Sequence, residues 1–407
     1  MKRFPWSAVL LLALIFLFAS LFTHCTTKKK EEKSDLPPGE GPPPIYDPNI
    51  YGWGLGDTVY EYEFGEWHHL EAPSIDLPIK GAYFPTHGFG YVFSDRRIYQ
   101  YNGGIWKDFT PTDKPPAFFF DMAMTGDGAM WFASIDLFQN SYLTSLSLDG
   151  LTTVYSVQEA ITTSRARVTS ILSIPGDPFL QILAEVDGWW QRLYFDGAAW
   201  VGDEIVESPL GASTVVYDLN LAPDGTYWAV GQDQNAGEPR GVFWHGEGGG
   251  WTRIVGEMVS DCRTYNVRRL YFTPDGFGYA LADCLWTQIY RSEDLQNWIE
   301  MYLPGDKGEA FFISDLSMVS DSEGWAVGYN SIMDEPLLLV RDINGWQQAR
   351  PRETGLGDIL YATVMFPYPH NLGPDDDTVT DDDTMPADDD TAPTDDDTTP
   401  TDDDTTP

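Results

Sequence analysis

The chain has 407 residues, of which 42% are hydrophobic and 14% aromatic, and it contains 38 glycines and 29 prolines. This composition is typical of strands joined by turns and argues against a helical bundle. A formal net charge of −39 would repel phosphate backbones, so nucleic acid is excluded as an expected partner.

The first 25 residues have the layout of an export signal, because two basic residues precede an apolar run that ends at Cys25. The segment resembles a bacterial lipoprotein signal, which implies cleavage before Cys25 and attachment of lipid to its thiol. Thr26 is not the aspartate of inner-membrane retention, so the outer membrane or cell surface is the expected location. An uncleaved membrane anchor and ordinary secretion are the alternatives, and all three export the chain.

Residues 26–49 are first charged and then rich in proline. They show no apolar periodicity, so we expect a stiff, solvated linker. The folded part of the chain is expected to span residues 50–368.

Within that span a short phrase recurs, as in "APDGTYWAVG" (222–231), "TPDGFGYALADC" (273–284) and "DSEGWAVGYN" (321–330). An aromatic marks the second strand of each repeat, with Leu183 assigned to that place in the fourth repeat: Trp53, Tyr91, Trp131, Trp228, Tyr279 and Trp325. A tryptophan opens the fourth strand of every repeat but the third: Trp67, Trp106, Trp200, Trp251, Trp298 and Trp346. We expect these tryptophans to pack between neighbouring repeats.

Both markers recur about every 45 residues, and repeats of about 40–50 residues with four strands each predict a β-propeller. Turns such as Pro223-Asp224-Gly225 and Asn344-Gly345 would join the strands tightly. The first repeat lacks an opening strand, while residues 358–367 form an unassigned strand after the seventh. The sequence therefore predicts an all-β, seven-bladed propeller of four-stranded antiparallel blades, closed by a C-terminal strand in the first blade.

With Cys25 assigned to lipid, Cys262 and Cys284 remain in an exported chain. A hairpin turn centred near residue 273 would place them opposite each other in the sixth repeat. We therefore expect a disulfide between them, with two buried thiols as the alternative.

The stretches "YNGGIW" (101–106), "YFDGAAW" (194–200) and "INGWQ" (343–347) resemble the exported propeller repeats of bacterial lipoproteins. More distantly, the repeats are similar to photosystem II assembly-factor and sialidase-type (BNR, or Asp-box) propellers. "RSEDLQNW" (291–298) is similar to an Asp box at Ser292 and Asp294, whereas Gln296 stands in place of the glycine. The resemblance implies the fold, and it implies a sialidase-like or other carbohydrate-active enzyme only as an alternative function.

Catalytic, metal and cofactor sites are not expected. No pair of carboxylates is singled out as a general acid and base. His68 and His69 are neighbours on a strand and would point to opposite sides, so they cannot bind one metal ion together. No cofactor is expected, and a binding module is favoured over an enzyme.

If a binding site exists, the loops from second to third strands are its expected place, because three of them are long. The residues expected on this rim are Asp136, Phe138, Gln139, Asn140, Asp233, Asn235, Arg240, Asn330, Met333 and Asp334. Apolar loop tips such as Phe138, Ile332 and Met333 favour a protein partner.

Residues 369–407 repeat Asp-Asp-Asp-Thr and are expected to be a disordered acidic tail. The triplets lack the turn glycine and distal glutamate of a calcium loop, so loose calcium binding is the most they predict. Taken together, the sequence predicts a non-catalytic binding or scaffold propeller, lipid-anchored at the cell envelope, whose partner is a protein or a surface glycan. A spacer with no specific ligand is a further alternative.

Overall fold

The computed structural model describes residues 50–367 with several gaps, which are residues 64–65, 71–74, 77, 113–116, 148, 162, 164, 175, 196–198, 206–213, 234–239, 248–249, 255–257, 260–265, 305–309, 333–334 and 349–359. The predicted signal segment 1–25 with Cys25, the linker 26–49 and the tail 369–407 lie outside the described residues and stay predictions. No helix of the described part is long and apolar enough to cross a membrane.

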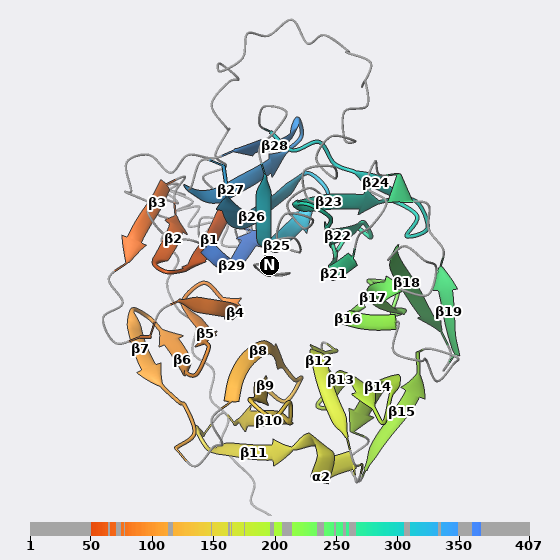
Figure 1. The fold of residues 1–407 in the computed structure, drawn as a ribbon. Helices are drawn as coiled ribbons and strands as arrows, with labels where there is room; N and C mark the ends of the chain where they lie inside the picture. Colours follow the sequence, from red (N-terminus) through yellow and green to blue (C-terminus); the bar gives the residue numbers. More distant parts are fainter. Residues whose placement is uncertain are drawn as a thin grey trace, which may run out of the picture. The chain divides into compact units, whose positions relative to one another are not determined.

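Seven antiparallel sheets stand around a central axis, each of four strands, so the predicted seven-bladed propeller is confirmed (Figure 1). From the axis outward, the first blade consists of β29 (Leu360–Pro367), β1 (Ile50–Gly56), β2 (Val59–Glu63) and β3 (Glu66–Leu70), and the second of β4 (Ile79–Thr86), β5 (Phe89–Ser94), β6 (Ile98–Asn102) and β7 (Ile105–Asp108). The third blade consists of β8 (Ala117–Met124), β9 (Met130–Asp136), β10 (Ser141–Leu146) and β11 (Thr152–Ser156). The fourth consists of β12 (Ala166–Ser173), β13 (Leu180–Val186), β14 (Trp189–Phe195) and β15 (Trp200–Glu204).

The fifth blade consists of β16 (Thr214–Leu221), β17 (Tyr227–Asp233), β18 (Arg240–Glu247) and β19 (Gly250–Ile254). The sixth consists of β21 (Asn266–Phe272), β22 (Gly278–Asp283), β23 (Thr287–Ser292) and β24 (Trp298–Glu300). The seventh consists of β25 (Phe311–Ser320), β26 (Glu323–Asn330), β27 (Glu335–Asp342) and β28 (Gly345–Gln348). The two-residue strand β20 (Met258–Val259) adds a parallel outer edge to the sixth blade. One short helix, α2 (Val157–Ile161), follows β11.

The ring is closed by β29, which lies beside β1 as the innermost strand of the first blade. The Thr363 hydroxyl donates a hydrogen bond to the Trp53 carbonyl oxygen over 3.0 Å, and these residues are 310 positions apart in the sequence. Closure by the late strand was predicted and is confirmed. It covers the inner edge of β1, which would otherwise stand open to pair with another chain.

The turns have the predicted chemistry. Gly225 and Gly276, in the turns between first and second strands, have φ of +84° and +94°, which a residue with a Cβ adopts only at a cost. Asp224 accepts a hydrogen bond from the Thr226 backbone N–H over 2.9 Å, so the turn is fixed by its own side chain.

The aromatic repeat forms the contacts between blades. The second-strand aromatic of one blade meets the fourth-strand tryptophan of the next, with ring centroids 6.5 Å apart for Trp53 and Trp106 and 4.9 Å apart for Trp325 and Trp67. Tyr279 and Trp346 share one apolar cluster in the same way. The predicted packing between blades is confirmed at these interfaces.

The fourth blade departs from the prediction. Leu183 pairs with Ser170, which follows the bulge of β12. In the fifth blade the residue after the bulge is Asp218, and the aromatic Trp228 pairs with Asn220, two residues further along β16. The corresponding pair in the fourth blade, two residues beyond Ser170, is Leu172 with Gln181. The assignment of Leu183 to the aromatic position was therefore wrong by two residues, and a glutamine holds the place.

The register of the sixth blade also corrects the spacing argument for the cysteines. Phe272 pairs with Gly278 and Leu270 with Ala280, so the turn is centred near residue 275 instead of 273. Cys284 is disulfide-bonded, but Cys262 lies outside the described residues, so the pairing of these two cysteines stays a prediction.

Candidate functional site

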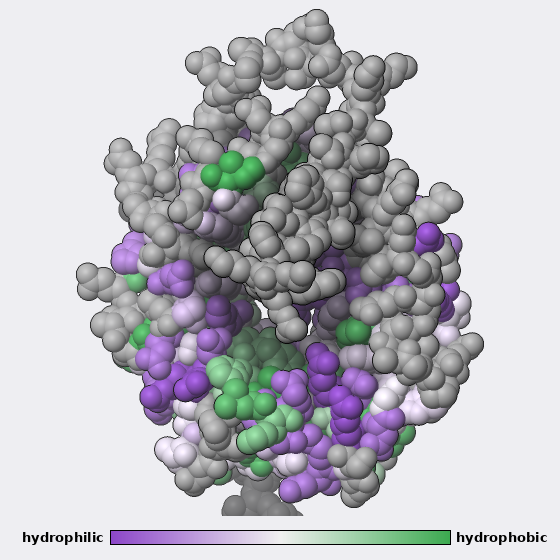
Figure 2. Space-filling model, viewed as in Figure 1, coloured by the Kyte–Doolittle hydropathy of each residue, from purple (hydrophilic) through white to green (hydrophobic). Residues whose placement is uncertain are grey.

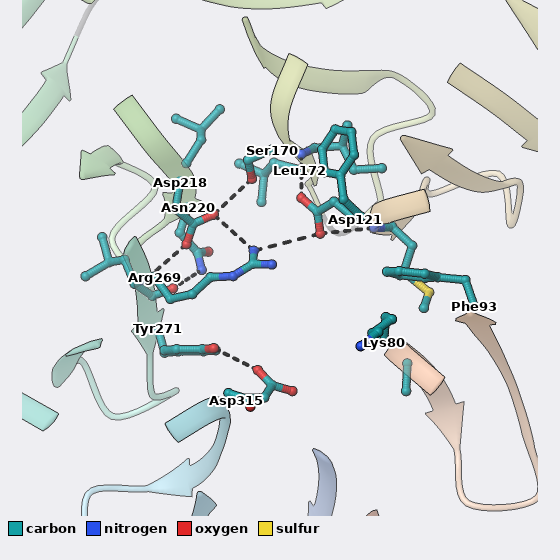
Figure 3. Close-up of a pocket in the computed structure, with 18 of the residues that line it drawn as sticks. Lys80, Phe93, Asp121, Ser170, Leu172, Asp218, Asn220, Arg269, Tyr271 and Asp315 are labelled. Carbon is teal, nitrogen blue, oxygen red and sulfur yellow. Dashed lines mark hydrogen bonds and ion pairs between the residues drawn. The ribbon is translucent and has the colours of Figure 1, made fainter. Parts of the chain in front are cut away.

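The innermost strands of all seven blades line a central cavity of about 220 Å³. Each of these strands contributes polar residues to the lining, and Tyr361 is the one from β29. Figure 3 labels most of the others: Lys80, Asp121, Ser170, Asp218, Asn220, Arg269, Tyr271 and Asp315. None of these residues was singled out from the sequence as a site. Five of them directly follow a bulge of an innermost strand, which no residue type in the sequence announces: Asp121, Ser170, Asp218, Arg269 and Asp315.

Three carboxylates in this cavity link neighbouring blades. They come from the third, fifth and seventh blades, and each accepts a hydrogen bond from a backbone N–H of the following blade. The pairs are Asp121 with Ile171 (2.8 Å), Asp218 with Leu270 (2.9 Å) and Asp315 with Thr363 (3.0 Å). Bulges in β8, β16 and β25 immediately precede these aspartates, and a bulge redirects the side chain that follows it.

Arg269 reaches across the cavity toward two of these carboxylates. Its Nη1 lies 3.6 Å from Asp218 Oδ1 and 3.9 Å from Asp121 Oδ1. Burial raises the pKa of Asp121 and of Asp218, and the Arg269 charge only partly offsets this. Burial alone would lower the pKa of Arg269, but the two carboxylates raise it. Arg269 therefore serves as the counter-charge of the two buried carboxylates, Asp121 and Asp218.

The opposite wall of the cavity carries the remaining polar groups. The Tyr271 hydroxyl donates to Asp315 over 2.8 Å, and burial raises the pKa of Tyr271 well above its usual value. Lys80 Nζ lies 3.6 Å from the centroid of the Tyr361 ring, a cation–π contact across the closing strand. Since each cavity carboxylate already accepts hydrogen bonds, the arrangement favours bracing of the blades over acid–base catalysis.

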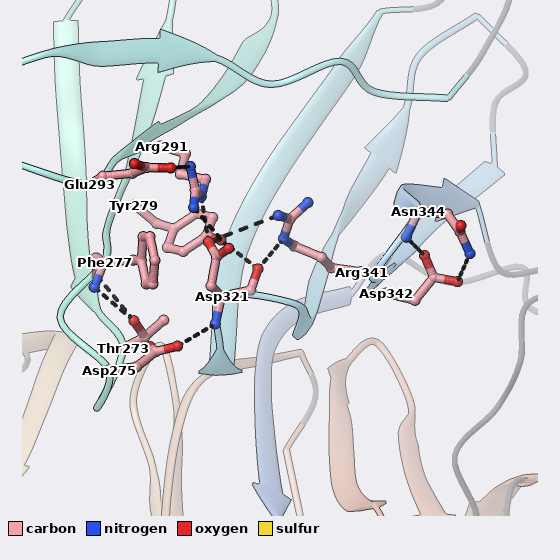
Figure 4. Close-up of polar contacts among 10 residues, drawn as sticks. All are labelled: Thr273, Asp275, Phe277, Tyr279, Arg291, Glu293, Asp321, Arg341, Asp342 and Asn344. Carbon is pink, nitrogen blue, oxygen red and sulfur yellow. Dashed lines mark hydrogen bonds and ion pairs between the residues drawn. The ribbon is translucent and has the colours of Figure 1, made fainter.

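A second charged cluster joins the sixth and seventh blades near the turn between β25 and β26 (Figure 4). Asp321 accepts hydrogen bonds from the Arg291 guanidinium and from the Tyr279 hydroxyl, the latter over 2.8 Å. Burial opposes the ionisation of Asp321, but these hydrogen bonds and the nearby Arg341 charge lower its pKa. Each of these groups is paired, so this cluster is also structural.

The expected rim residues lie at the end of the ring where second strands pass into third strands. Asp136, Asp233 and Asn330 end β9, β17 and β26, and all three are buried. Asp136 accepts hydrogen bonds from the backbone N–H of Phe138 and of Asn140, which lowers its pKa despite desolvation. The described rim residues thus hold the loops in shape, and they belong to three blades that are not neighbours.

The described residues at the tips of these loops are exposed, unlike the buried residues at the strand ends. Phe138 is 85% exposed, and Gln139 beside it adopts a positive φ of 68°. Arg240, at the start of β18, is exposed. Asn235, Met333 and Asp334 lie outside the described residues.

Two neighbouring blades present apolar side chains at this end of the ring that the sequence did not bring together. Leu285 and Trp286 stand in the loop between β22 and β23, with Trp286 40% exposed. In the seventh blade, Ile332 is 59% exposed in the loop after β26, and Phe312 is exposed at the start of β25. We call Leu285, Trp286, Phe312 and Ile332 the apolar rim. Only Ile332 had been noted from the sequence.

The surface is otherwise mixed. Figure 2 shows one face, on which apolar residues gather over β8 and β9 of the third blade among mainly polar residues. His68 and His69 are both exposed on β3. Among the described residues, no group of three or more His, Cys, Asp or Glu side chains is placed to hold a metal ion.

The stretch similar to an Asp box forms a turn. Asp294 accepts hydrogen bonds from the backbone N–H of Gln296 and of Asn297, over 2.9 and 2.8 Å, and these lower its pKa. Leu295 takes a positive φ of 58° within it. The carboxylate is fully engaged in the turn and is not available as a catalytic group.

Comparison with known proteins shows the fold alone. The sequence matches no protein-family model and no curated protein. Among solved structures, a protein from Lactobacillus plantarum is similar, with a TM-score of 0.55 and 12% identity over 78% of this chain and 99% of that chain. A structure described as YCF48 bound to D1 peptide has a TM-score of 0.50 and 17% identity over 77% of this chain and 90% of that chain. A putative 6-phosphogluconolactonase from Bacteroides uniformis has a TM-score of 0.50 and 11% identity over 78% of this chain and all of that chain.

Proposed function

We propose that this chain is a non-catalytic binding module whose apolar rim docks a protein partner. The observation that carries the proposal is the grouping of exposed Leu285, Trp286 and Ile332 on loops of two adjacent blades. Large apolar side chains exposed together mark interaction surfaces, and tryptophan is enriched at the energetic centres of such surfaces. YCF48, a propeller of similar fold, has been seen with a bound peptide, which supports the proposal by analogy of fold only.

The rim has support that a docking surface needs. Thr287 donates a hydrogen bond to Asp283 over 2.7 Å across the loop that carries Leu285 and Trp286. Asn330 accepts one from the Ile332 backbone N–H over 3.1 Å. Because the loop ends are fixed, the exposed side chains are presented with little conformational entropy left to lose on binding.

Site-specific photo-crosslinking in the native host tests this proposal. A photo-reactive residue at Trp286 or Ile332 should capture the same protein, since both belong to one surface. Ile343 is the matched control, because it is 87% exposed in the turn between β27 and β28, at the opposite end of the ring. Capture of different proteins at the two rim positions, or equal capture at Ile343, would contradict the proposal.

Export and lipid anchoring are part of the same proposal. They rest on the basic and apolar start of the chain and on Cys25. Replacement Cys25→Ser should move the protein from the membrane fraction to the soluble fraction, and mass spectrometry of the mature chain should find lipid at residue 25. We also propose the Cys262–Cys284 disulfide, which the same spectrum would detect as a linked peptide pair under non-reducing conditions.

A carbohydrate-active enzyme is the weaker alternative. The described carboxylates nearest to an Asp box or to the central cavity are already hydrogen-bonded within the fold, as with Asp294 and Asp218. Hydrolysis of chromogenic glycosides that a single carboxylate-to-amide change abolishes would establish this alternative over the binding module.

A further inference from the structure

The interface between the fourth and fifth blades contains an open groove. A groove of about 410 Å³ runs between these blades, at the end of the ring opposite the apolar rim. Its lining comes from both blades and includes Gln181, Arg192, Tyr194, Tyr227, Glu247 and Trp251. This volume lies within the range of about 300–1,000 Å³ that small-molecule sites occupy.

The groove lies where the second strand lacks the aromatic residue of the repeat. At the other blade interfaces the second strand contributes a tryptophan or tyrosine, such as Trp325 against the first blade. In the fourth blade Gln181 holds that register. Trp251 is the fourth-strand tryptophan of the fifth blade, and it makes no aromatic ring contact with any described residue. Its counterpart Trp67 lies 4.9 Å from Trp325.

Trp251 is nevertheless held in place. A Cβ added at Gly246 would lie 3.0 Å from the Trp251 ring, so the indole lies directly against the backbone of β18. On the other side of the groove, the Arg192 guanidinium lies 3.9 Å from the centroid of the Tyr227 ring and pairs with Asp203. The groove thus has a fixed indole on one wall and fixed polar groups on the other.

The polar groups of the groove include both donors and acceptors without partners. Gln181 is only 5% exposed, and its amide nitrogen donates to the Tyr227 hydroxyl over 2.8 Å. Its Oε1 atom and the Nε–H of Arg192 are buried and have no hydrogen-bond partner in the described structure. Both atoms are closed to solvent as the side chains lie, so a ligand reaches them only when Gln181 or Arg192 turns toward the groove. A hydrogen bond formed there recovers the free energy that a buried polar atom without a partner costs. Hydroxyl groups donate and accept at once, whereas ammonium groups only donate and carboxylates only accept.

Charge narrows the class of ligand further. Asp177, Asp203 and Glu247 line the groove against one guanidinium, that of Arg192, so anionic ligands are repelled. The Tyr227 face that an organic cation would occupy is already covered by Arg192. A neutral ring with one apolar face and several hydroxyls fits both walls.

We propose that this groove binds a neutral sugar. The pyranose ring would stack on Trp251 in the space that an aromatic side chain fills at other interfaces, with its hydroxyls toward Gln181 and Glu247. This site goes beyond the proposed docking of a protein at the apolar rim and does not depend on it, because the two lie at opposite ends of the ring.

Calorimetric titration of the full chain tests the site. The probes are the methyl glycosides of glucose, galactose, mannose and N-acetylglucosamine, together with maltose, cellobiose and lactose. We expect at least one to bind with a dissociation constant on the order of 1 mM, which is within reach of a ligand of this size. N-acetylneuraminic acid and choline serve as the anionic and cationic comparisons. Absence of binding by every neutral probe at tenfold higher concentration, or binding of only the charged probes, would overturn the proposal.

Two variants locate the binding. Trp251→Ala removes the stacking surface and should weaken affinity at least tenfold, whereas Trp200→Ala, the equivalent change at the interface of the third and fourth blades, should leave it unchanged. Gln181→Trp restores the missing aromatic and should abolish binding while the protein stays folded. If Trp251→Ala does not fold, Gln181→Trp still decides, since sugar binding that survives it takes place elsewhere and the proposal is wrong.

Discussion

The interface between the seventh and first blades and the interface between the fourth and fifth show two uses of one repeat. At the first, Trp325 and Trp67 lie 4.9 Å apart, and Tyr62 packs edge-on against Trp325 at 5.0 Å. At the second, Gln181 replaces the second-strand aromatic and a groove of about 410 Å³ remains beside Trp251. The same backbone register therefore occurs at a packed interface and beside an open groove. The two differ in the side chain at the second-strand position, which is Trp325 in the first case and Gln181 in the second.

The largest loss of stability should come from removing a tryptophan at the packed interface between the seventh and first blades. Trp325→Ala removes a fully packed indole where the ring closes, so we expect it to lower the free energy of unfolding by about 3–5 kcal/mol. Trp251→Ala should cost clearly less, because its ring has no aromatic partner. Urea unfolding of both variants measures the difference, and equal losses would show that the two interfaces are not distinct.

The next largest loss of stability should come from loosening the closing strand, β29. The Asp315 carboxylate accepts hydrogen bonds from the Thr363 backbone N–H and from the Tyr271 hydroxyl. Asp315→Ala leaves two buried donors without a partner, so the unfolding free energy should fall by about 1–3 kcal/mol. Hydrogen exchange should show the loss of protection concentrated in β29 and β1. Uniform loss across all seven blades would contradict a local role in closure.

Stability should depend on pH in opposite senses at two carboxylates. Burial raises the folded-state pKa of Asp218, so its contribution is present below the unfolded pKa and is lost as pH rises through the folded value. Asp321 has a lowered folded-state pKa, so its contribution is present above the unfolded pKa and is lost as pH falls through the folded value.

Measuring the unfolding free energy from pH 3 to pH 7 separates the two. Asp218→Asn should remove the part of the decline that sets in as pH rises above about 4, the usual aspartate pKa. Asp321→Asn should remove part of the loss on the acid side below that pH. Parallel curves for both variants would contradict this assignment.

Much of the architecture follows from the sequence, because its signals are local and repeated. The spacing of Trp53 to Trp325 and the turns at Gly225 and Gly276 predicted the blade count, and the strand expected at residues 358–367 predicted closure. The register of the fourth blade could not be predicted in the same way. Its second strand has Gln181 at the position where the other blades have an aromatic residue, so the residue that marks the register elsewhere is missing.

The cavity and the groove were harder still to predict. Asp121, Asp218 and Arg269 are far apart in the sequence and meet only because the ring places their strands around one axis. Adjacent residues of a strand point to opposite sides, so Arg268 bonds to Asp283 while Arg269 enters the cavity. Which carboxylates it would meet depends on blade order in three dimensions.

The smallest effect on stability should come from the surface. Trp286→Ser or Ile332→Ser changes an exposed side chain, so the unfolding free energy should stay within about 0.5 kcal/mol of the original. If the apolar rim docks a protein, crosslinking to that protein should nevertheless be lost. A large loss of stability would mean that these residues serve the fold instead of a partner.

The contrast between the sealed and the open interface is tested most directly by a crystal structure of the chain soaked with the neutral sugar that binds best in titration. We predict a pyranose ring stacked on Trp251, with hydroxyls within hydrogen-bond distance of Gln181 and Glu247. An empty groove, with the sugar bound in the central cavity or at another interface, would contradict the account.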